Sequence, residues 1–222
     1  PPDPERDERG PLFLDAAERV AGELRGAVWA AGAVTGPFTL ATQLAGIENL
    51  FEWMLADAGR AHDLIAFAGR VCRRFAAAYL RRGVPVCLFD SNASPALISP
   101  AQYREFALGE LRASVAAVNA AGQRHCPLIT GGPTLAIVDE MIESGANYLL
   151  CDSLREAPEV VARAARAGRA VRVNLPAAAV AAGGGALRGE TARLARELRE
   201  FPNWFWGSGV IAPAPSLDFP RE

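Results

Sequence analysis

The sequence predicts an α/β protein in which parallel strands alternate with helices, and three observations predict it. Short apolar runs recur along the 222-residue chain and stop at polar residues. Stretches with helical spacing separate these runs. Half of the residues are hydrophobic, which is enough for a sizeable core. Strands separated by helices pair in parallel through right-handed crossovers, so we expect a single α/β domain over residues 1–222.

The segment from Val84 to Phe89 shows the pattern most clearly. Its near-continuous apolar run is typical of a parallel strand covered on both faces. Asp90 follows at the carboxyl end, and Ser91 and Asn92 begin a loop of short polar side chains. Ser99-Pro100 then supplies a serine N-cap and a proline at the first helical position. The segment therefore predicts one complete βα unit.

The chain before this unit is predicted to contain one strand and four helices. Gly36 is expected to let the backbone turn before Pro37 starts a helix. The expected elements are a helix with apolar positions from Leu12 to Leu24, a strand over Ala27–Val34, the helix that starts at Pro37, a helix around Ile47–Ala56, and a helix over about Ala61–Arg82.

The chain after this unit repeats the pattern. Trp204 and Trp206 lie on one strand face, where packing in the core is expected. The expected strands are Cys126–Ile129, Tyr148–Cys151, Ala170–Asn174 and Trp204–Trp206. The expected helices are Pro100–Ala120, a helix with apolar residues from Leu135 to Ile142 that stops at Gly145, Glu156–Ala167 and Glu190–Glu200, with a helical turn and flexible loop over Ala177–Gly185.

Six parallel strands joined by helices favour an incomplete TIM (β/α)8-type barrel. No dinucleotide-binding or Walker motif follows any of the strands. A full barrel has eight strands and typically about 250 residues, so about six of the eight are present. We expect the amino-terminal portion of the barrel to be missing.

In such barrels the chemistry takes place at the carboxyl ends of the strands. Asp90 and Asp152 are the catalytic candidates, although each could instead cap the loop or helix that follows it. The substrate-binding candidates are Thr35, Ser91, Asn92, Thr130, Asn174 and Ser208. Parallel topology leads us to expect all these residues around one cavity, with a raised pKa or a nearby donor for one carboxylate.

Composition and charge exclude several functions. The net charge of −2 without a basic stripe argues against nucleic acid and anionic membranes as partners. All basic side chains are arginine, so Schiff-base and P-loop chemistry are excluded. Four isolated cysteines are typical of reduced, buried thiols. No run has the length of a membrane helix and no signal-peptide pattern is found, so we expect a cytoplasmic protein.

Several motifs together resemble the uroporphyrinogen decarboxylase superfamily, and most closely its corrinoid-dependent methyltransferase branch. The resemblance covers nearly the whole chain, in the family's order. It rests on Thr35–Ala41 (TGPFTLA), Asp90–Ser94 (DSNAS), Ile98–Phe106 (ISPAQYREF), Asn174–Pro176 (NLP) and the Gly-Ser-Gly turn at 207–209. It implies a TIM barrel whose amino-terminal third is absent here. In the family that third supplies the arginine and the aspartate on which the decarboxylase depends, so neither residue can be assigned in this sequence.

The resemblance also implies a zinc site that this chain departs from. Methyltransferases of the branch hold zinc with a His-x-Cys pair and a cysteine in the last glycine-rich turn. Leu128 and Thr130 occupy the positions of the pair. The last turn contains Ser208, Gly209 and Val210, and none of these is a cysteine. His125 and Cys126 are adjacent and face opposite sides of a strand, so they do not replace it. We therefore expect no zinc and no tightly bound cofactor.

Three functions stay open from the sequence. The first is methyl transfer involving a small-molecule substrate and a corrinoid carried by a partner protein. The second is decarboxylation of a tetrapyrrole carboxylate, for which only Ser91 of the decarboxylase pattern is kept, with Gln43 and Ser208 replacing a tyrosine and a histidine. The third is a non-catalytic family member. Open sheet edges lead us to expect low stability or a homo-oligomer.

Overall fold

The core of the protein is a parallel six-stranded sheet whose strands are ordered β1-β2-β3-β4-β5-β6. The structure is a computed structural model that describes residues 1–24, 27–182 and 184–208. The strands are β1 Gly32–Thr35, β2 Val86–Phe89, β3 Pro127–Ile129, β4 Tyr148–Cys151, β5 Ala170–Leu175 and β6 Trp204–Ser208.

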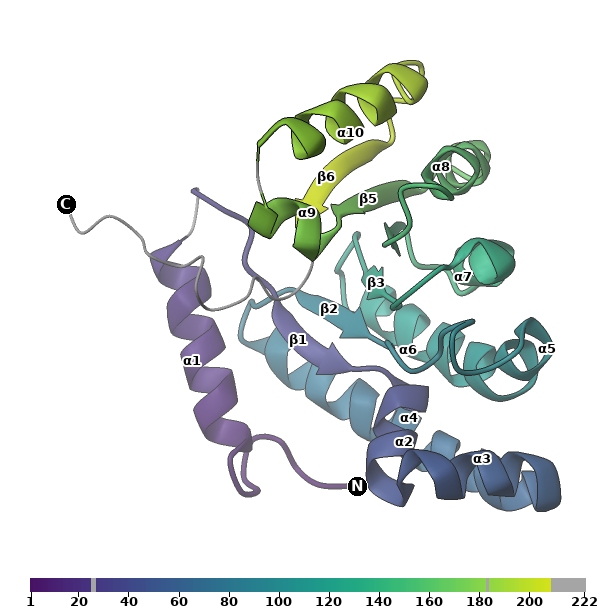
Figure 1. Ribbon diagram of the computed structural model, residues 1–222. Coiled ribbons are helices and arrows are strands. Elements are labelled where there is room, and N and C mark those ends of the chain that lie inside the picture. The colour runs from purple at the N-terminus through teal and green to yellow at the C-terminus, as the bar shows by residue number, and fades with distance from the viewer. Residues whose placement is uncertain (25–26, 183, 209–222) are drawn as a thin grey trace.

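Each strand pairs with the next one in the chain, so the order never reverses as it does in a doubly wound sheet. The helices between strands therefore lie on one side, and Figure 1 shows α4, α6, α7, α8 and α10 along the convex side of the sheet. This is the arrangement of a (β/α) barrel. The predicted α/β barrel-type fold with about six parallel strands is confirmed.

The helices follow the predicted order, with differences at several ends. Pro37 and Pro100 stand at helix starts as predicted, and Ser99 forms a full capping box with Gln102. The helices are α1 Gly10–Glu23, α2 Pro37–Ala45, α3 Ile47–Ala56, α4 Ala58–Arg81, α5 Pro100–Gln102, η1 Tyr103–Ala107, α6 Leu108–Ala120, η2 Leu135–Ile137, α7 Val138–Glu143, α8 Ala157–Arg166, α9 Ala177–Ala182 and α10 Gly184–Glu197.

Side chains alternate between the two faces of the sheet. One set packs against the helices in the main core, including Val34, Leu88, Leu128 and Val173. The opposite, concave face is called here the inner wall. Residues of the inner wall, assigned from this alternation, are Ala33, Thr35, Cys87, Phe89, Ile129, Tyr148, Leu150, Arg172, Asn174, Phe205 and Gly207.

The predicted strand over Ala27–Val34 is wrong for residues 27–31, because β1 begins at Gly32. Strand β1 has only four residues because its neighbour β2 offers only four, Val86–Phe89, in the paired register. Val28 and Trp29 lie before the strand and are each 58% exposed. The apolar character of these two residues therefore predicted a longer strand than β2 can pair with.

The predicted helix over Pro100–Ala120 is interrupted by a π-helical turn, η1. Phe106, Ala107 and Leu108 are consecutive and all buried. The π-helical turn inserts one extra residue into the helix at the place where this buried run lies.

The segment over Ala177–Gly185 is more helical than predicted, because α9 and the start of α10 fall within it. Gly184 has a φ of +70°, which favours glycine at the entry to α10. The helix expected from Glu190 therefore begins earlier.

None of the helices in the described part of the chain is long and apolar enough to cross a membrane.

Candidate functional site

Asp152 and Asn174 form a polar pair at the carboxyl ends of β4 and β5. The Asn174 side-chain amide donates a hydrogen bond to Asp152 Oδ1. Asn174 is 3% exposed, whereas Asp152 is partly exposed and accessible to a ligand. A buried amide therefore orients an accessible carboxylate, and the structure brings together these two predicted residues from neighbouring strands.

Arg172 extends this pair into a chain of three side chains. Its Nε donates to Asn174 Oδ1 over 2.9 Å, so Asn174 connects the guanidinium to the Asp152 carboxylate. Sequence reasoning missed Arg172, because it considered only the residues at strand ends. The available signal was the alternation itself: Val171 and Val173 are apolar and buried, which places Arg172 on the opposite face.

Helix α8 is capped by the residue after Asp152 and not by Asp152 itself. Ser153 Oγ accepts a hydrogen bond of 3.3 Å from the backbone N–H of Glu156 at the start of α8. The Ser153 carbonyl accepts from Glu156 and Ala157. Asp152 is therefore directed to Asn174, while Ser153 caps the helix.

Asp90 has a different environment. Its side chain is completely buried, and its Oδ1 accepts a hydrogen bond of 2.7 Å from the backbone N–H of Thr39 in the first turn of α2. A Cβ on Gly36 would lie 2.5 Å from the Cβ and Cγ of Asp90. Gly36 has a φ of −67°, which any residue adopts, so glycine is needed there for the close approach of Asp90 rather than for turning the chain.

The expectation that all predicted side chains line one cavity is wrong for Asp90 and Thr130. Strand alternation places both on the helix side of the sheet, and both are 0% exposed. Burial raises the pKa of Asp90, and the hydrogen bonds from α2 only partly oppose this. Among the described residues, Asp90 Oδ2, Thr130 Oγ1 and the Tyr103 hydroxyl have no hydrogen-bond partner. A catalytic role for Asp90 stays a prediction.

Asn92 and Ser91 follow Asp90 but do different things. The Asn92 backbone N–H donates to Thr39 Oγ1 over 3.0 Å, and its side-chain amide donates to Thr42 Oγ1 over 2.7 Å. Asn92 therefore fastens the loop after β2 to helix α2. Ser91 is exposed, and its carbonyl oxygen lies 3.6 Å from where a Cβ on Gly131 would be. A binding role for Ser91 stays a prediction.

Thr35 lies apart from Asp152 and Asn174. It lines a mostly apolar cavity of about 430 Å³ beside β1, together with Phe13, Phe75 and Tyr79. Strand β1 is three strands from β4, which is roughly 14 Å along the sheet. Ser208 pairs through its backbone with Leu175 at the end of β6, and its side chain lies outside the described residues. Binding roles for Thr35 and Ser208 stay predictions.

The side chains present do not fit the zinc site of the resembling methyltransferases. Leu128 packs in the main core and Thr130 is buried, so neither position offers an imidazole or a thiol. Burial raises the pKa of Cys151 to about 11 and that of Cys72, Cys87 and Cys126 to about 12, which opposes thiolate formation. The described residues include no group of three possible metal ligands.

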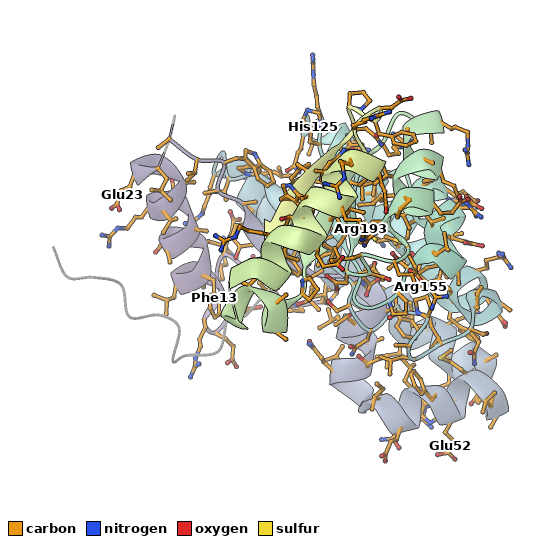
Figure 2. The ribbon with its side chains drawn as sticks, turned by 45° about the horizontal axis from the view of Figure 1, so that its top comes forward. Phe13, Glu23, Glu52, His125, Arg155 and Arg193 are labelled. Carbon is orange, nitrogen blue, oxygen red and sulfur yellow. The ribbon has the colours of Figure 1, made fainter. Side chains whose placement is uncertain are left out.

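His125 is not part of the site. It is exposed and lies two residues before β3, at the amino ends of the strands. Figure 2 shows it at the opposite end of the molecule from Glu52 of α3, a helix that follows the carboxyl end of β1. Its ring therefore lies far from the end that carries Asp152.

The fold and this site define a class: barrel-type α/β proteins with polar side chains at the carboxyl ends of parallel strands. Comparison with known proteins then defines the family. The family model described as uroporphyrinogen decarboxylase (URO-D) matches residues 1–209. The chain belongs to the URO-D family.

Two curated relatives are methyltransferases by name. The chain is 33% identical over 101 residues to a methylated-thiol–coenzyme M methyltransferase of Methanosarcina mazei, a match covering 45% of this chain and 28% of the relative. It is 27% identical over 138 residues to the methylcobamide:CoM methyltransferase MtaA of Methanosarcina barkeri, a match covering 62% of this chain and 40% of the relative.

A solved structure supports the fold. A methyltransferase from Methanosarcina mazei superposes with a TM-score of 0.74 at 22% identity, covering 96% of this chain and 62% of that protein. Every match described here thus spans less than two thirds of the other protein.

Proposed function

We propose that the chain takes part in methyl transfer between a corrinoid and a small molecule. The observation that carries this proposal is the similarity to two differently named coenzyme M methyltransferases within the URO-D family. The family name alone would fit a decarboxylase equally well. The likeness to a solved methyltransferase is consistent with the proposal but bears on the fold alone.

The inner wall between β4 and β5 supplies the groups that such a reaction needs. A thiol accepts a methyl group as its anion, so its proton must leave. Asp152 is an accessible carboxylate that Asn174 holds in one orientation, and it is our candidate for taking up this proton. The carbon–cobalt bond of the methylated corrinoid breaks, its electron pair stays with the corrinoid, and a carbon–sulfur bond forms.

In this proposal Asp90 positions the site rather than contacting substrate. Its carboxylate holds the first turn of α2, and α2 in turn holds the loop of Ser91 and Asn92 through Thr39 and Thr42. The proposal keeps the prediction of a zinc-free reaction, because Leu128 and Thr130 supply no zinc ligand.

The experiment is a methyl-transfer assay with purified protein, methylcobalamin as donor and a thiol as acceptor. Loss of the methylcobalamin absorption spectrum and appearance of the methyl thioether are expected, in equal amounts. No transfer from methylcobalamin or from a methylated corrinoid protein, under conditions where the chain is folded, would contradict the proposal and favour a non-catalytic family member. Release of CO₂ from a tetrapyrrole carboxylate would favour the decarboxylase.

A further inference from the structure

Asp90 is the one aspartate among the described residues that is buried, and the two oxygens of its carboxyl group differ in their contacts. Oδ1 accepts the hydrogen bond from the backbone N–H of Thr39. Oδ2 is buried and has no hydrogen-bond partner in the described part of the chain. Buried polar atoms in folded proteins normally have a partner, so this oxygen calls for an explanation.

Thr130 lies directly beside Asp90 on the same face of the sheet. Strands β2 and β3 pair with Phe89 opposite Ile129, and the backbone N–H of Asp90 continues the ladder to the Ile129 carbonyl over 2.9 Å. The next residues, Asp90 and Thr130, are therefore neighbours across the two strands, with Cα atoms about 5 Å apart. Thr130 Oγ1 is likewise buried without a partner among the described residues.

The third member of this buried set is Tyr103, the first residue of the π-helical turn η1. Its side chain is fully buried, and its hydroxyl has no partner among the described residues. Burial raises the pKa of the phenol, and a negative charge on Asp90 or Glu140 would raise it further, so the ring lies within electrostatic reach of both carboxyl groups. Glu140 is itself paired with Arg104 over 2.5 Å. The oxygens without partners on Asp90, Thr130 and Tyr103 thus occur in one part of the core.

The surroundings of Asp90 do not compensate a negative charge. Helix α2 has no ionisable residue and supplies hydrogen-bond donors alone. Cys72 of α4 and Tyr103 of η1 face Asp90, and besides burial a negative charge on Asp90 would raise the pKa of both groups. Arg73 of α4 pairs with Glu110 over 2.6 Å, and among the described residues no cation forms an ion pair with Asp90. A buried carboxylate without a cation is costly, and such a group takes up a proton instead.

We propose that Asp90 is held as a neutral carboxylic acid and forms one uncharged hydrogen-bonded site with the hydroxyls of Thr130 and Tyr103. A protonated carboxyl group donates one hydrogen bond and keeps an acceptor, whereas a carboxylate only accepts. Each hydroxyl is both a donor and an acceptor. The three groups can therefore satisfy one another while Asp90 Oδ1 still accepts from Thr39.

The proton has a structural task in this proposal. Asp90 Oδ1 holds the first turn of α2, and α2 holds the loop after β2 through the hydrogen bonds of Asn92 to Thr39 and Thr42. Loss of the proton would place an unpaired charge beneath this assembly. The proton therefore stabilises the attachment of α2 and the loop to the sheet, whatever reaction the protein performs.

The test is the carboxyl-carbon NMR spectrum of the protein labelled with isotopic aspartate, recorded at neutral pH. One aspartate is expected to show the chemical shift of a neutral acid, and the others that of a carboxylate. The signal of the neutral acid should vanish in Asp90→Asn and remain in Asp139→Asn, which removes an exposed carboxylate from α7. Because Asp90 is the buried aspartate of the described residues, the wild-type spectrum decides the case should Asp90→Asn fail to fold.

Two further variants test the hydroxyls. Tyr103→Phe and Thr130→Val each remove one hydroxyl with little change of shape, and each should shift the carboxyl signal of Asp90. Tyr148→Phe, on the inner wall, should leave that signal unchanged. Urea denaturation gives a second readout, in which Tyr103→Phe should raise the unfolding equilibrium constant about three- to tenfold through loss of a hydrogen bond. Removal of a buried hydroxyl that has no partner would instead be neutral or stabilising.

An ionised Asp90 at neutral pH would overturn the inference. An Asp90 signal that moves in neither hydroxyl variant would also overturn it, and so would a Tyr103→Phe variant at least as stable as the wild type. None of these measurements involves turnover. Failure of methyl transfer would therefore leave the neutral site standing, and an ionised Asp90 would leave the proposed function standing.

Discussion

Asp90 Oδ1 accepts a hydrogen bond of 2.7 Å from the backbone N–H of Thr39, a residue 51 positions earlier in the chain. A carboxylate at the end of β2 thus caps α2, the helix that follows β1. The bond ties two consecutive βα units together at the end of the sheet that carries the candidate site. It satisfies a helix N–H that has no partner within the helix itself.

Replacing Asp90 with alanine should destabilise the protein by about 1–3 kcal/mol, because the N–H of Thr39 would be left buried without an acceptor. Asp90→Asn should cost less, since its amide oxygen can accept the same hydrogen bond. Urea denaturation of the three proteins measures the difference. Equal stability of Asp90→Ala and the wild type would mean that the capping bond contributes nothing.

The stability contributed by Asp90 should fall as pH rises. Burial raises the pKa of this carboxyl group above its unfolded value of 3.8, so the folded state binds the proton more tightly than the unfolded state. The contribution is therefore complete below pH 3.8 and is lost as pH increases through the folded pKa. The difference in unfolding free energy between wild type and Asp90→Asn, followed from pH 3.5 to 8, should shift in favour of the variant. A constant difference would contradict a raised pKa.

Gly36→Ala should destabilise by about 1–3 kcal/mol through overlap with Asp90, since the new Cβ would lie 2.5 Å from the Asp90 Cβ. The matched control is Gly109→Ala in α6, where no atom lies within 4 Å of the new Cβ. That substitution should stabilise by about 0.5–1 kcal/mol, because alanine favours helix. Thermal melts of both variants test the pair, and equal effects would show that the contact with Asp90 is unimportant.

Gly207→Ala should disturb the inner wall more than the fold. The added Cβ displaces the side chains of Arg172 and Asn174, which it would approach to 2.1 Å and 2.5 Å. The melting temperature should change by a few degrees at most, while the rate of methyl transfer from methylcobalamin to a thiol falls about tenfold or more, because Asn174 no longer holds the Asp152 carboxylate in one orientation. An unchanged rate would show that the placement of Asn174 across β6 does not matter.

Much of the fold could be predicted from the sequence because the strands are short apolar runs with clear polar ends. Tyr148–Cys151 was predicted to the residue, and helix starts at Pro37 and Ser99-Pro100 have local signals. The strand before Thr35 was predicted too long, because its length depends on how many residues β2 can pair. That is a property of two segments far apart in the chain.

The site was harder to predict because the residue that follows a strand can lie on either face of the sheet. Asp90 and Asp152 both follow apolar strands, yet one is buried beneath α2 and the other is oriented on the inner wall. Strands β2 and β4 are apolar on both faces, so the face of the residue that follows each cannot be read from its sequence. In β5, by contrast, the alternation of Val171 and Val173 with Arg172 can be read directly. The partner of Asp90 is not visible in the local sequence, since the bond spans 51 residues.

The most direct test of the account is the methyl-transfer rate of Asp152→Asn from methylcobalamin to a thiol. Asp139→Asn on the outer helix α7 and Asp90→Asn serve as controls. We predict that Asp152→Asn lowers the rate about a hundredfold or more with an unchanged melt, as for loss of a group that accepts a proton. Asp139→Asn should be unaffected, and Asp90→Asn should retain most of the rate. A fully active Asp152→Asn, or an inactive but folded Asp90→Asn, would contradict the assignment of the working site to the inner wall.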